Sequence, residues 1–189
     1  DIAARAGLGT TSNDHLIGFD MSDDLLVGGA GNDVLWGSSG SDTLQGGAGD
    51  DELHAIGRTR TSGTDDTDVL EGGLGNDLLY AADGHVTYRF ETGFGQDTIK
   101  WTAQHNPEAV AKAVFGQGIS PADVVCARSP WGVLSLRVGS GGDVVSVEGF
   151  FDSYADNGLS RAHRPLERIE FADGTVWTEE HTPQGTLEG

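Results

Sequence analysis

The chain contains 189 residues, of which 30 are glycine, and its 30 acidic and 11 basic residues give a formal net charge of -19. This surplus of negative charge argues against nucleic acid and anionic membrane surfaces as partners, because both are negatively charged, and it favours cations. The sequence has no run of about 18 apolar residues and no basic-then-apolar start, so we expect neither a transmembrane segment nor a cleavable export signal. The polar ends at Asp1 and Gly189 favour a fragment of a longer protein.

The first hundred residues repeat with a period of nine. A typical unit has a glycine-rich turn, an Asp at its sixth place and an apolar residue at its eighth place, although unit 19–27 has lost its glycines. In chain order the units are residues 9–17, 19–27, 28–36, 37–45, 46–54, 63–71, 72–80, 81–89 and 92–100. Residues 55–62 break the pattern, and Val86 stands where the eighth unit should have Asp. Such a period indicates units that stack on their neighbours, because one unit cannot bury its own apolar side.

The eighth-place residues predict the kind of element that is stacked. They are Leu16, Leu26, Leu35, Leu44, Leu53, Leu70, Leu79, Tyr88 and Ile99. With a glycine turn every nine residues, each of them can belong only to a very short strand, because a helix does not tolerate glycine at that density. Short strands joined by similar turns and stacked in one direction predict a parallel β-roll with two units per coil.

Beyond Lys100 the period vanishes and the sequence predicts other β-structure. Ser120 before Pro121 predicts a short helical turn, since the two residues suit an N-cap and a first helical place. Residues 131–138 and 144–147 predict a hairpin across a glycine turn, and residues 166–171 and 175–177 predict a second hairpin on an Asp-Gly turn. The single cysteine, Cys126, cannot form an internal disulfide and is expected to be a packed thiol.

Stacked coils bring one carboxylate per turn to the same place. Asp24 and Asp42 are eighteen residues apart, and so are Asp33 and Asp51, which is one coil of two units. Two carboxylates about 5 Å apart repel by roughly 3 kcal/mol at an effective dielectric near 20, so a cation has to neutralise them. Asp oxygens and carbonyls oriented by glycine are hard donors that can surround a large ion, which favours Ca²⁺ over Zn²⁺ or Cu²⁺.

The pattern GGxGxDxUx in residues 28–36, 46–54 and 72–80 is similar to that of the RTX (repeats-in-toxin) haemolysin-type calcium-binding repeats. This resemblance implies a right-handed parallel β-roll with Ca²⁺ between turns, in proteins exported by type I secretion. The phrases GQGISPADV at 116–124 and ERIEFADGTVW at 167–177 resemble the β-rich segment that often follows such repeats. We therefore expect an all-β chain with the roll in residues 1–100 and a capping region in residues 101–189.

Carried over residue by residue, the family pattern implies particular metal sites. One site contains Asp33 and Asp51 with carbonyls near Gly28, Ala30, Gly47 and Gly49. A second site contains Asp24 and Asp42 with Gly40 nearby. Asp14 facing Asp33 is a further pair, although Gly18 shifts the frame between them by one residue.

Residues 55–62 leave the later pairs open. If those eight residues fill one half-coil, Asp51 faces Asp68, and Asp77 faces Asp97. If they loop out, the aspartates after the break face those of the opposite side of the roll, and Val86 leaves one site without its Asp. We favour the first arrangement, because eight residues nearly equal one unit. Four to six bound Ca²⁺ ions are the resulting expectation.

The sequence contains no constellation typical of a catalyst. The six histidines never fall three or four residues apart, and GxSxG, HExxH and phosphate-loop motifs are absent, so we expect no enzyme activity. Our hypothesis is a secreted calcium-dependent folding module of a larger toxin, adhesin or hydrolase, with the type I secretion apparatus as the partner that the resemblance implies. The alternative is an adhesive module in which the roll is a scaffold and the C-terminal half binds a carbohydrate or protein.

Overall fold

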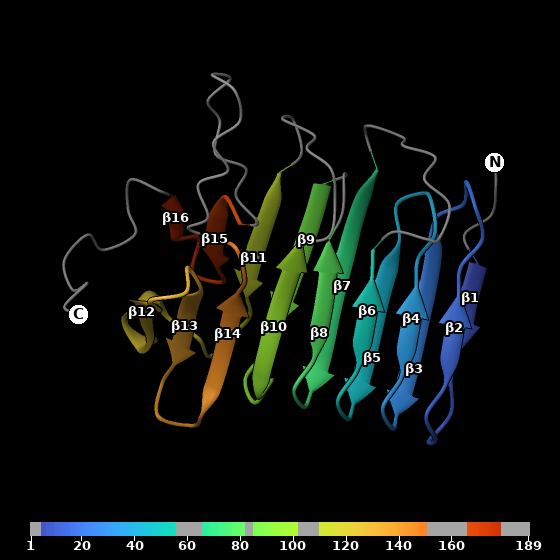
Figure 1. The fold of residues 1–189 in the computed structure, drawn as a ribbon, viewed down its shortest axis with the longest axis horizontal. Coiled ribbons are helices and arrows are strands. Elements are labelled where there is room, and N and C mark those ends of the chain that lie inside the picture. The colour runs from blue at the N-terminus through green and yellow to red at the C-terminus, as the bar shows by residue number, and fades with distance from the viewer. Residues whose placement is uncertain (1–4, 56–65, 82–84, 102–109, 151–165, 179–189) are drawn as a thin grey trace.

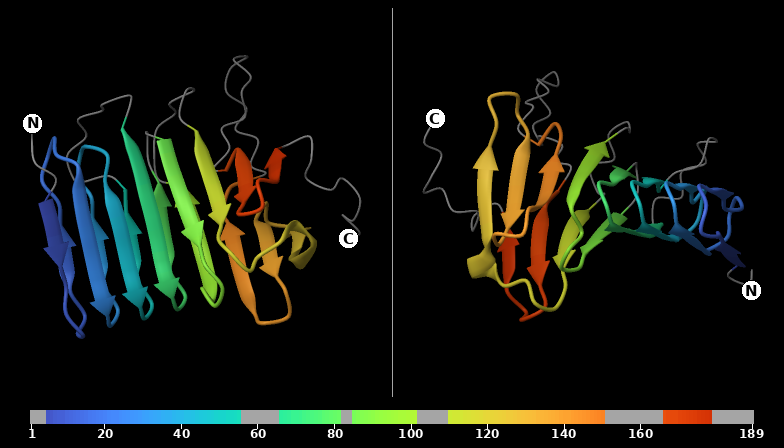
Figure 2. Two further views of the ribbon diagram at one scale, coloured as in Figure 1. Left: turned by 180° about the vertical axis from the view of Figure 1, so that it is seen from behind. Right: turned by 90° about the horizontal axis from the view of Figure 1, so that it is seen from below.

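Two β-sheets packed face to face make up nearly all of the fold (Figure 1). The computed structural model describes residues 5–55, 66–81, 85–101, 110–150 and 166–178. Seen from below in Figure 2, the sheets form two layers, with β1 and β2 at one end and β12 to β16 at the other. The described residues contain no helix that is long and apolar enough to cross a membrane.

Each sheet has eight strands among the described residues. Sheet A consists, in spatial order, of β1 (Arg5–Leu8), β3 (Asp24–Ala30), β5 (Thr43–Ala48), β7 (Thr67–Leu74), β9 (His85–Phe90), β11 (Ala111–Phe115), β15 (Arg168–Phe171) and β16 (Val176–Thr178). Sheet B consists of β2 (His15–Ile17), β4 (Val34–Trp36), β6 (Glu52–His54), β8 (Leu78–Ala81), β10 (Gln96–Trp101), β14 (Asp143–Val147), β13 (Leu134–Val138) and β12 (Val124–Arg128). Consecutive strands up to β11 therefore alternate between the sheets.

Neighbouring strands from β1 to β11 run parallel within each sheet, which confirms the predicted parallel β-roll. The eighth-place side chains fill the space between the sheets. Those with no exposed surface are Leu35, Leu44, Leu53, Leu70, Leu79, Tyr88 and Ile99. Burying one such side chain contributes roughly 1.5–3 kcal/mol, so this apolar column is the main packing contribution to the roll.

The strands on either side of the break in the repeat are neighbours within each sheet. β5 pairs directly with β7, and β6 pairs directly with β8, so the coils before and after the break are consecutive. The arrangement that we favoured, in which those residues fill one half-coil, is therefore wrong, although residues 56–62 themselves lie outside the described part of the chain. The physical reason is visible in the sequence, because Arg60 and Ser62 stand at the places that need an Asp and a buried apolar side chain.

Three planar side chains stack on the outer face of sheet B. Trp36, His54 and Tyr80 are ninth-place residues in register on β4, β6 and β8. The ring centroids of Trp36 and His54 are 3.7 Å apart and those of His54 and Tyr80 are 4.5 Å apart, with the rings within 5° of parallel. The stack therefore runs across three consecutive coils and fixes their register from outside the core.

Both sheets continue beyond residue 101. β14 pairs in parallel with β10, and β15 pairs in parallel with β11. The two predicted hairpins are present as β13–β14 and β15–β16, although β13 begins at Leu134 rather than at Trp131. The predicted helical turn is the 3₁₀-helix η1 (Pro121–Asp123). The division into a roll and a capping region at residues 100 and 101 stays a prediction.

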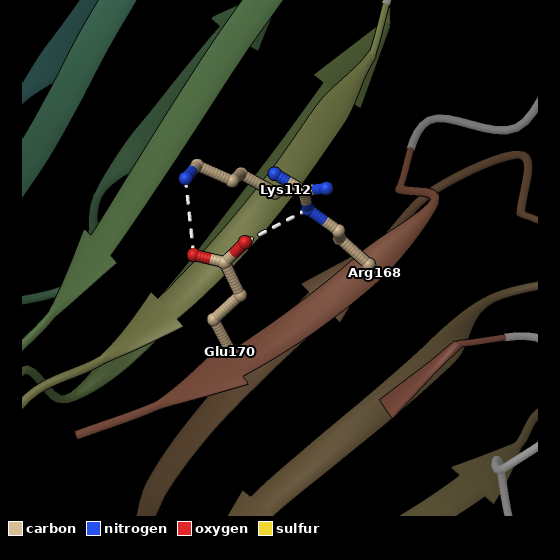
Figure 3. A network of polar contacts seen from close by, with 3 residues as sticks. All are labelled: Lys112, Arg168 and Glu170. Carbon is tan, nitrogen blue, oxygen red and sulfur yellow. Dashed lines mark hydrogen bonds and ion pairs between the residues drawn. The ribbon is translucent and has the colours of Figure 1, made fainter. Parts of the chain in front are cut away.

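Glu170 joins β15 to the roll on the outer face of sheet A (Figure 3). Its carboxylate accepts the Nζ of Lys112 on β11 at 3.0 Å and the Nε of Arg168 at 2.8 Å. All three side chains are partly exposed, so this network contributes at most about 1 kcal/mol per pair. Its main consequence is that it helps to hold β15 beside β11 in one register.

Candidate metal centre

The sixth-place aspartates form two rows, one beside each sheet. The sheet B row consists of Asp14, Asp33, Asp51, Asp77 and Asp97. The sheet A row consists of Asp24, Asp42 and Asp68. In every step, the backbone N–H of one aspartate donates to the Oδ1 of the aspartate one coil later, at 2.7 to 3.0 Å. Each carboxylate after the first of its row is thereby held in a fixed orientation by the preceding coil.

The rows bring together most of the pairs that the sequence predicts. Asp24 lies one coil from Asp42, Asp33 lies one coil from Asp51, and Asp14 faces Asp33 across the slip. Asp77 likewise lies one coil from Asp97.

Asp68 is the exception. Because β5 pairs with β7 and β6 pairs with β8, Asp51 faces Asp77 and Asp42 faces Asp68. The predicted pairing of Asp51 with Asp68 is therefore wrong. The sheet A row ends at Asp68, since its partner on β9 is Val86.

One oxygen of most of these carboxylates is buried without a hydrogen-bond partner among the described residues. It is the Oδ2 of Asp33, Asp42, Asp51, Asp77 and Asp97, and the Oδ1 of Asp24. These six side chains belong to residues that are at most 4% exposed. A buried charge without a partner is costly, so such oxygens are expected to bind a cation or to be protonated.

Glycine leaves space beside these unpaired oxygens. A Cβ placed on Gly28 would collide with the Oδ2 of Asp33 and would lie 2.6 Å from the carbonyl oxygen of Gly46 in the next coil. Gly46 repeats this arrangement with the Oδ2 of Asp51 and the carbonyl oxygen of Gly72. Each cradle therefore combines a carboxylate oxygen with a carbonyl oxygen one coil later, and only glycine at the first place keeps it open.

The other predicted turn residues lie in the same turns. Gly40, Gly47 and Gly49 have φ values of 125°, 116° and 130°, which are accessible to glycine and strained for other residues. A Cβ on Gly47 would collide with the carbonyl of Gly29, so consecutive turns approach too closely for side chains. The N–H of Ala30 donates to the carbonyl of Thr10 at 3.1 Å. These residues therefore lie in the turns that precede the row aspartates, and their role as carbonyl ligands stays a prediction.

Burial controls the protonation of the rows. It raises the pKa of Asp51 to about 6, those of Asp42 and Asp77 to about 7, and those of Asp68 and Asp97 to about 8. A backbone N–H opposes the shift in each case, and the neighbouring carboxylates of the row add to it. The rows are therefore poorly suited to full ionisation without a counter-charge.

The donor chemistry fits a hard cation. No group of three or more His, Cys, Asp or Glu side chains able to hold a metal occurs in the part of the chain that the structure describes. Any ion in the rows would therefore rest on two carboxylates together with turn carbonyls, which is an all-oxygen set. Such a set suits Ca²⁺, which takes six to eight oxygen ligands, better than Zn²⁺, which prefers nitrogen and sulfur.

Asp143 is a polar residue at the end of the sheet B row that the sequence did not single out. Its carboxylate accepts the N–H of Gly93 at 2.8 Å and the N–H of Gly95 at 3.2 Å. Its only signal in the sequence is an acidic residue directly after the glycine turn at 139–142, and no period marks its place. It became recognisable only because β14 lies beside β10.

Comparison with known families agrees with this geometry. A family described as RTX calcium-binding nonapeptide repeat (4 copies) matches residues 21–53 and 62–85. A family described as haemolysin-type calcium binding protein related domain matches residues 134–181. A search of curated proteins found no match.

Among solved structures, the extracellular lipase LipA from Serratia marcescens is similar over 76% of this chain and 38% of its own, at 15% identity and a TM-score of 0.30. The chain thus corresponds to well under half the length of that lipase. By its two family matches, the chain contains RTX haemolysin-type calcium-binding repeats followed by a related haemolysin-type calcium-binding domain.

Proposed function

We propose that this chain is a calcium-dependent folding module whose two aspartate rows hold Ca²⁺ between consecutive turns. The observation that carries this proposal is the series of buried carboxylate oxygens without a partner among the described residues. Four of them, in Asp33, Asp42, Asp51 and Asp77, lie beside a glycine that leaves room for an ion. The match to calcium-binding repeats supports the identity of the ion.

The rows define which residues would hold the ions. Asp33 and Asp51, with carbonyls in the turns of Gly28 and Gly46, would hold one ion. Five aspartates in the sheet B row leave four gaps, and three in the sheet A row leave two, so the rows offer up to six sites. This count is the upper end of the four to six ions expected from the sequence.

Metal binding and folding would be coupled in this arrangement. Without ions, closing the coils brings carboxylates together in a buried setting, which opposes folding. Because the paired sites exist only in the folded chain, the free energy of binding becomes free energy of folding. Extracellular calcium modules bind at about 10⁻⁴ to 10⁻³ M, a range that would leave the chain unfolded in the cell and folded outside it.

The biological setting follows from the family. We infer that the chain is part of a larger protein, such as a toxin, an adhesin or a hydrolase, that is secreted by a type I apparatus and acts outside the cell or at its surface. The matched segments are calcium-binding repeats rather than catalytic domains, so the activity of the whole protein would come from another part of it.

Far-UV circular dichroism of the chain with chelator and with millimolar Ca²⁺ tests the coupling. We expect a largely unfolded spectrum in chelator and a β-rich spectrum with Ca²⁺. In chelator, burial of the apolar column alone has to outweigh the repulsion between the carboxylates of the rows. Mg²⁺ at the same concentration serves as the control, since it demands a tighter octahedral site and should leave the chain unfolded. Identical β-rich spectra in chelator and in Ca²⁺ would contradict the proposal.

Filling one cradle tests the site itself. Gly46→Ala places a methyl group against the Oδ2 of Asp51 and the carbonyl of Gly72, and the backbone at Gly46 is not left-handed, so only the cradle is affected. We expect the Ca²⁺ concentration at half-folding to rise about tenfold, equivalent to about 1.4 kcal/mol. Gly141→Ala is the matched control, because a Cβ there meets nothing within 4 Å and its backbone is likewise not left-handed. If Gly46→Ala and Gly141→Ala changed the Ca²⁺ concentration at half-folding equally, an ion beside Gly46 would be contradicted.

A further inference from the structure

The sheet B row does not end in open solvent. Its last nonapeptide turn, residues 92–97, is followed along the sheet by β14, a strand from outside the repeats. The N–H of Val144 donates to the carbonyl of Gly95 at 2.7 Å, so β14 lies directly on this turn. The next coil that each earlier turn has is here replaced by the start of β14.

The carboxylate of Asp143 accepts hydrogen bonds that a following turn of the roll would otherwise accept. Inside the roll, the fourth-place glycine donates its N–H to the third-place carbonyl one coil later, as Gly49 does to Leu74 at 2.8 Å. At the end of the row, the fourth-place residue Gly95 donates instead to the Oδ1 of Asp143, and Gly93 donates to the Oδ2. A carboxylate therefore stands where the following turn would have presented a carbonyl oxygen.

Asp97 has a free oxygen at the same junction. It is 1% exposed, its Oδ1 accepts the N–H of Asp77, and its Oδ2 is buried without a hydrogen-bond partner among the described residues. In the earlier coils the corresponding Oδ2 lies beside the first-place glycine, as that of Asp33 lies beside Gly28, and the carbonyl of Gly46 in the next coil approaches the same point. Asp97 pairs in register with Val145 of β14, two residues from Asp143. The charge of Asp143 is also close enough to act on Asp97.

The hydrogen bonds of Asp143 leave room for a cation. An ionised carboxylate has about four lone-pair positions, and the two amides of Gly93 and Gly95 occupy two of them. Two carboxylates at a partly buried junction, neither of them bonded to a basic side chain among the described residues, favour a divalent ion between them.

We propose that Asp97 and Asp143 form an additional Ca²⁺ site that joins the last turn of the roll to β14. This site rests on the proposed calcium binding of the rows, and it differs from them in taking one carboxylate from outside the repeats. Its consequence is that the β12–β14 segment is fastened to the roll by an ion as well as by the backbone.

Counting bound ions tests the site. Isothermal titration of the full chain with Ca²⁺ is expected to give one ion fewer for Asp143→Asn than for the wild type, because Asn keeps an acceptor for a glycine amide and removes the charge. Asp173→Asn is the matched control, since Asp173 also accepts a backbone N–H, from Thr175 at 2.8 Å, in an exposed turn away from the rows. It should bind as many ions as the wild type. An unchanged count and affinity for Asp143→Asn would overturn this site and leave the proposed function standing, whereas a wild type that binds no Ca²⁺ would overturn both.

A second measurement covers the case in which Asp143→Asn fails to fold. The carboxyl ¹³C resonances of wild-type protein saturated with Ca²⁺ are compared with those of the same protein saturated with La³⁺. We expect the resonances of Asp97 and Asp143 to shift on exchange of the ion and that of Asp173 to stay, because only carboxylates that touch the ion sense its charge. If Asp143 behaves like Asp173, the additional site is refuted.

Discussion

Replacing Asp51 by Asn should raise the Ca²⁺ concentration at half-folding at least tenfold, because Asp51 borders two gaps of the sheet B row. Its Oδ1 accepts the N–H of Asp33 at 2.7 Å, and its own N–H donates to Asp77 at 2.8 Å. Asn keeps an acceptor oxygen, so the backbone ladder can persist while both gaps lose a charged ligand. Each tenfold change corresponds to about 1.4 kcal/mol. Calcium titrations followed by far-UV circular dichroism measure the shift, and isothermal titration should show about two ions fewer.

Asp50 provides a control one residue away. Asp50→Asn removes the same charge, but Asp50 is exposed, and its Oδ1 accepts the N–H of Asn76 at 2.8 Å, a contact that Asn can preserve. We expect its midpoint to stay within about twofold of the wild type, in line with the small effect of exposed charges. If the two variants shifted the midpoint equally, the response would reflect net charge rather than ligands in the row.

Acid should stabilise the metal-free fold and weaken its response to Ca²⁺. The pKa values of five row carboxylates lie at about 6 to 8 in the folded chain against 3.8 when unperturbed, chiefly because of burial; they are those of Asp42, Asp51, Asp68, Asp77 and Asp97. The folded state therefore binds more protons between about pH 4 and 8. This contribution to stability is complete below pH 4 and is lost as the pH rises through 6 to 8.

Circular dichroism in chelator at pH 5 and pH 8 measures the first effect, and we expect more β-structure at pH 5. Calcium titrations at the same pH values measure the second, and the midpoint should be at least about tenfold higher at pH 5, since protons compete with the ion for the carboxylates. Asp123→Asn is the control and should respond to pH as the wild type does. The hydroxyl and N–H of Ser120 lower the pKa of that exposed carboxylate, so it does not titrate between pH 5 and pH 8. A metal-free spectrum that does not change between pH 5 and 8 would contradict the assignment of these carboxylates as the controlling groups.

The repeating half of the fold could be predicted because one rule governs every unit. Leu35, Leu44 and Leu53 share the eighth place, and all three are fully buried in the structure. The eighteen-residue spacing of Asp33 and Asp51 likewise predicts that they stand in consecutive coils, as their 2.7 Å contact shows. A short period repeated with glycine turns leaves the chain few other ways to bury its apolar side.

The register after the break was predicted wrongly because segment length was taken as the deciding signal. A better signal was present at the ninth place, where Trp36, His54 and Tyr80 carry planar rings. These rings stack across consecutive coils only if the break adds no half-coil, and the structure has that register. Side-chain complementarity between coils is therefore more informative than the number of residues in an interruption.

The region beyond residue 101 could be predicted only in pieces. Its hairpins follow from local turn chemistry, as with Asp173 and Gly174 before β16. The parallel pairing of β14 with β10 joins residues nearly fifty positions apart, and no local pattern encodes such a contact. Asp143 was missed for the same reason, because its role depends on this pairing rather than on the residues around it.

The alternation of units between the two sheets restricts how such a chain can change in length. Deleting one unit, for example residues 37–45, would transfer every later unit to the opposite sheet. Asp51 would then no longer lie in the same row as Asp33. Deleting two units would preserve both rows. An insertion between strands, such as the one between β6 and β7, costs mainly loop-closure entropy, which grows slowly with length. Homologous chains should therefore gain or lose whole eighteen-residue coils, or vary in such insertions, more readily than they gain or lose single units.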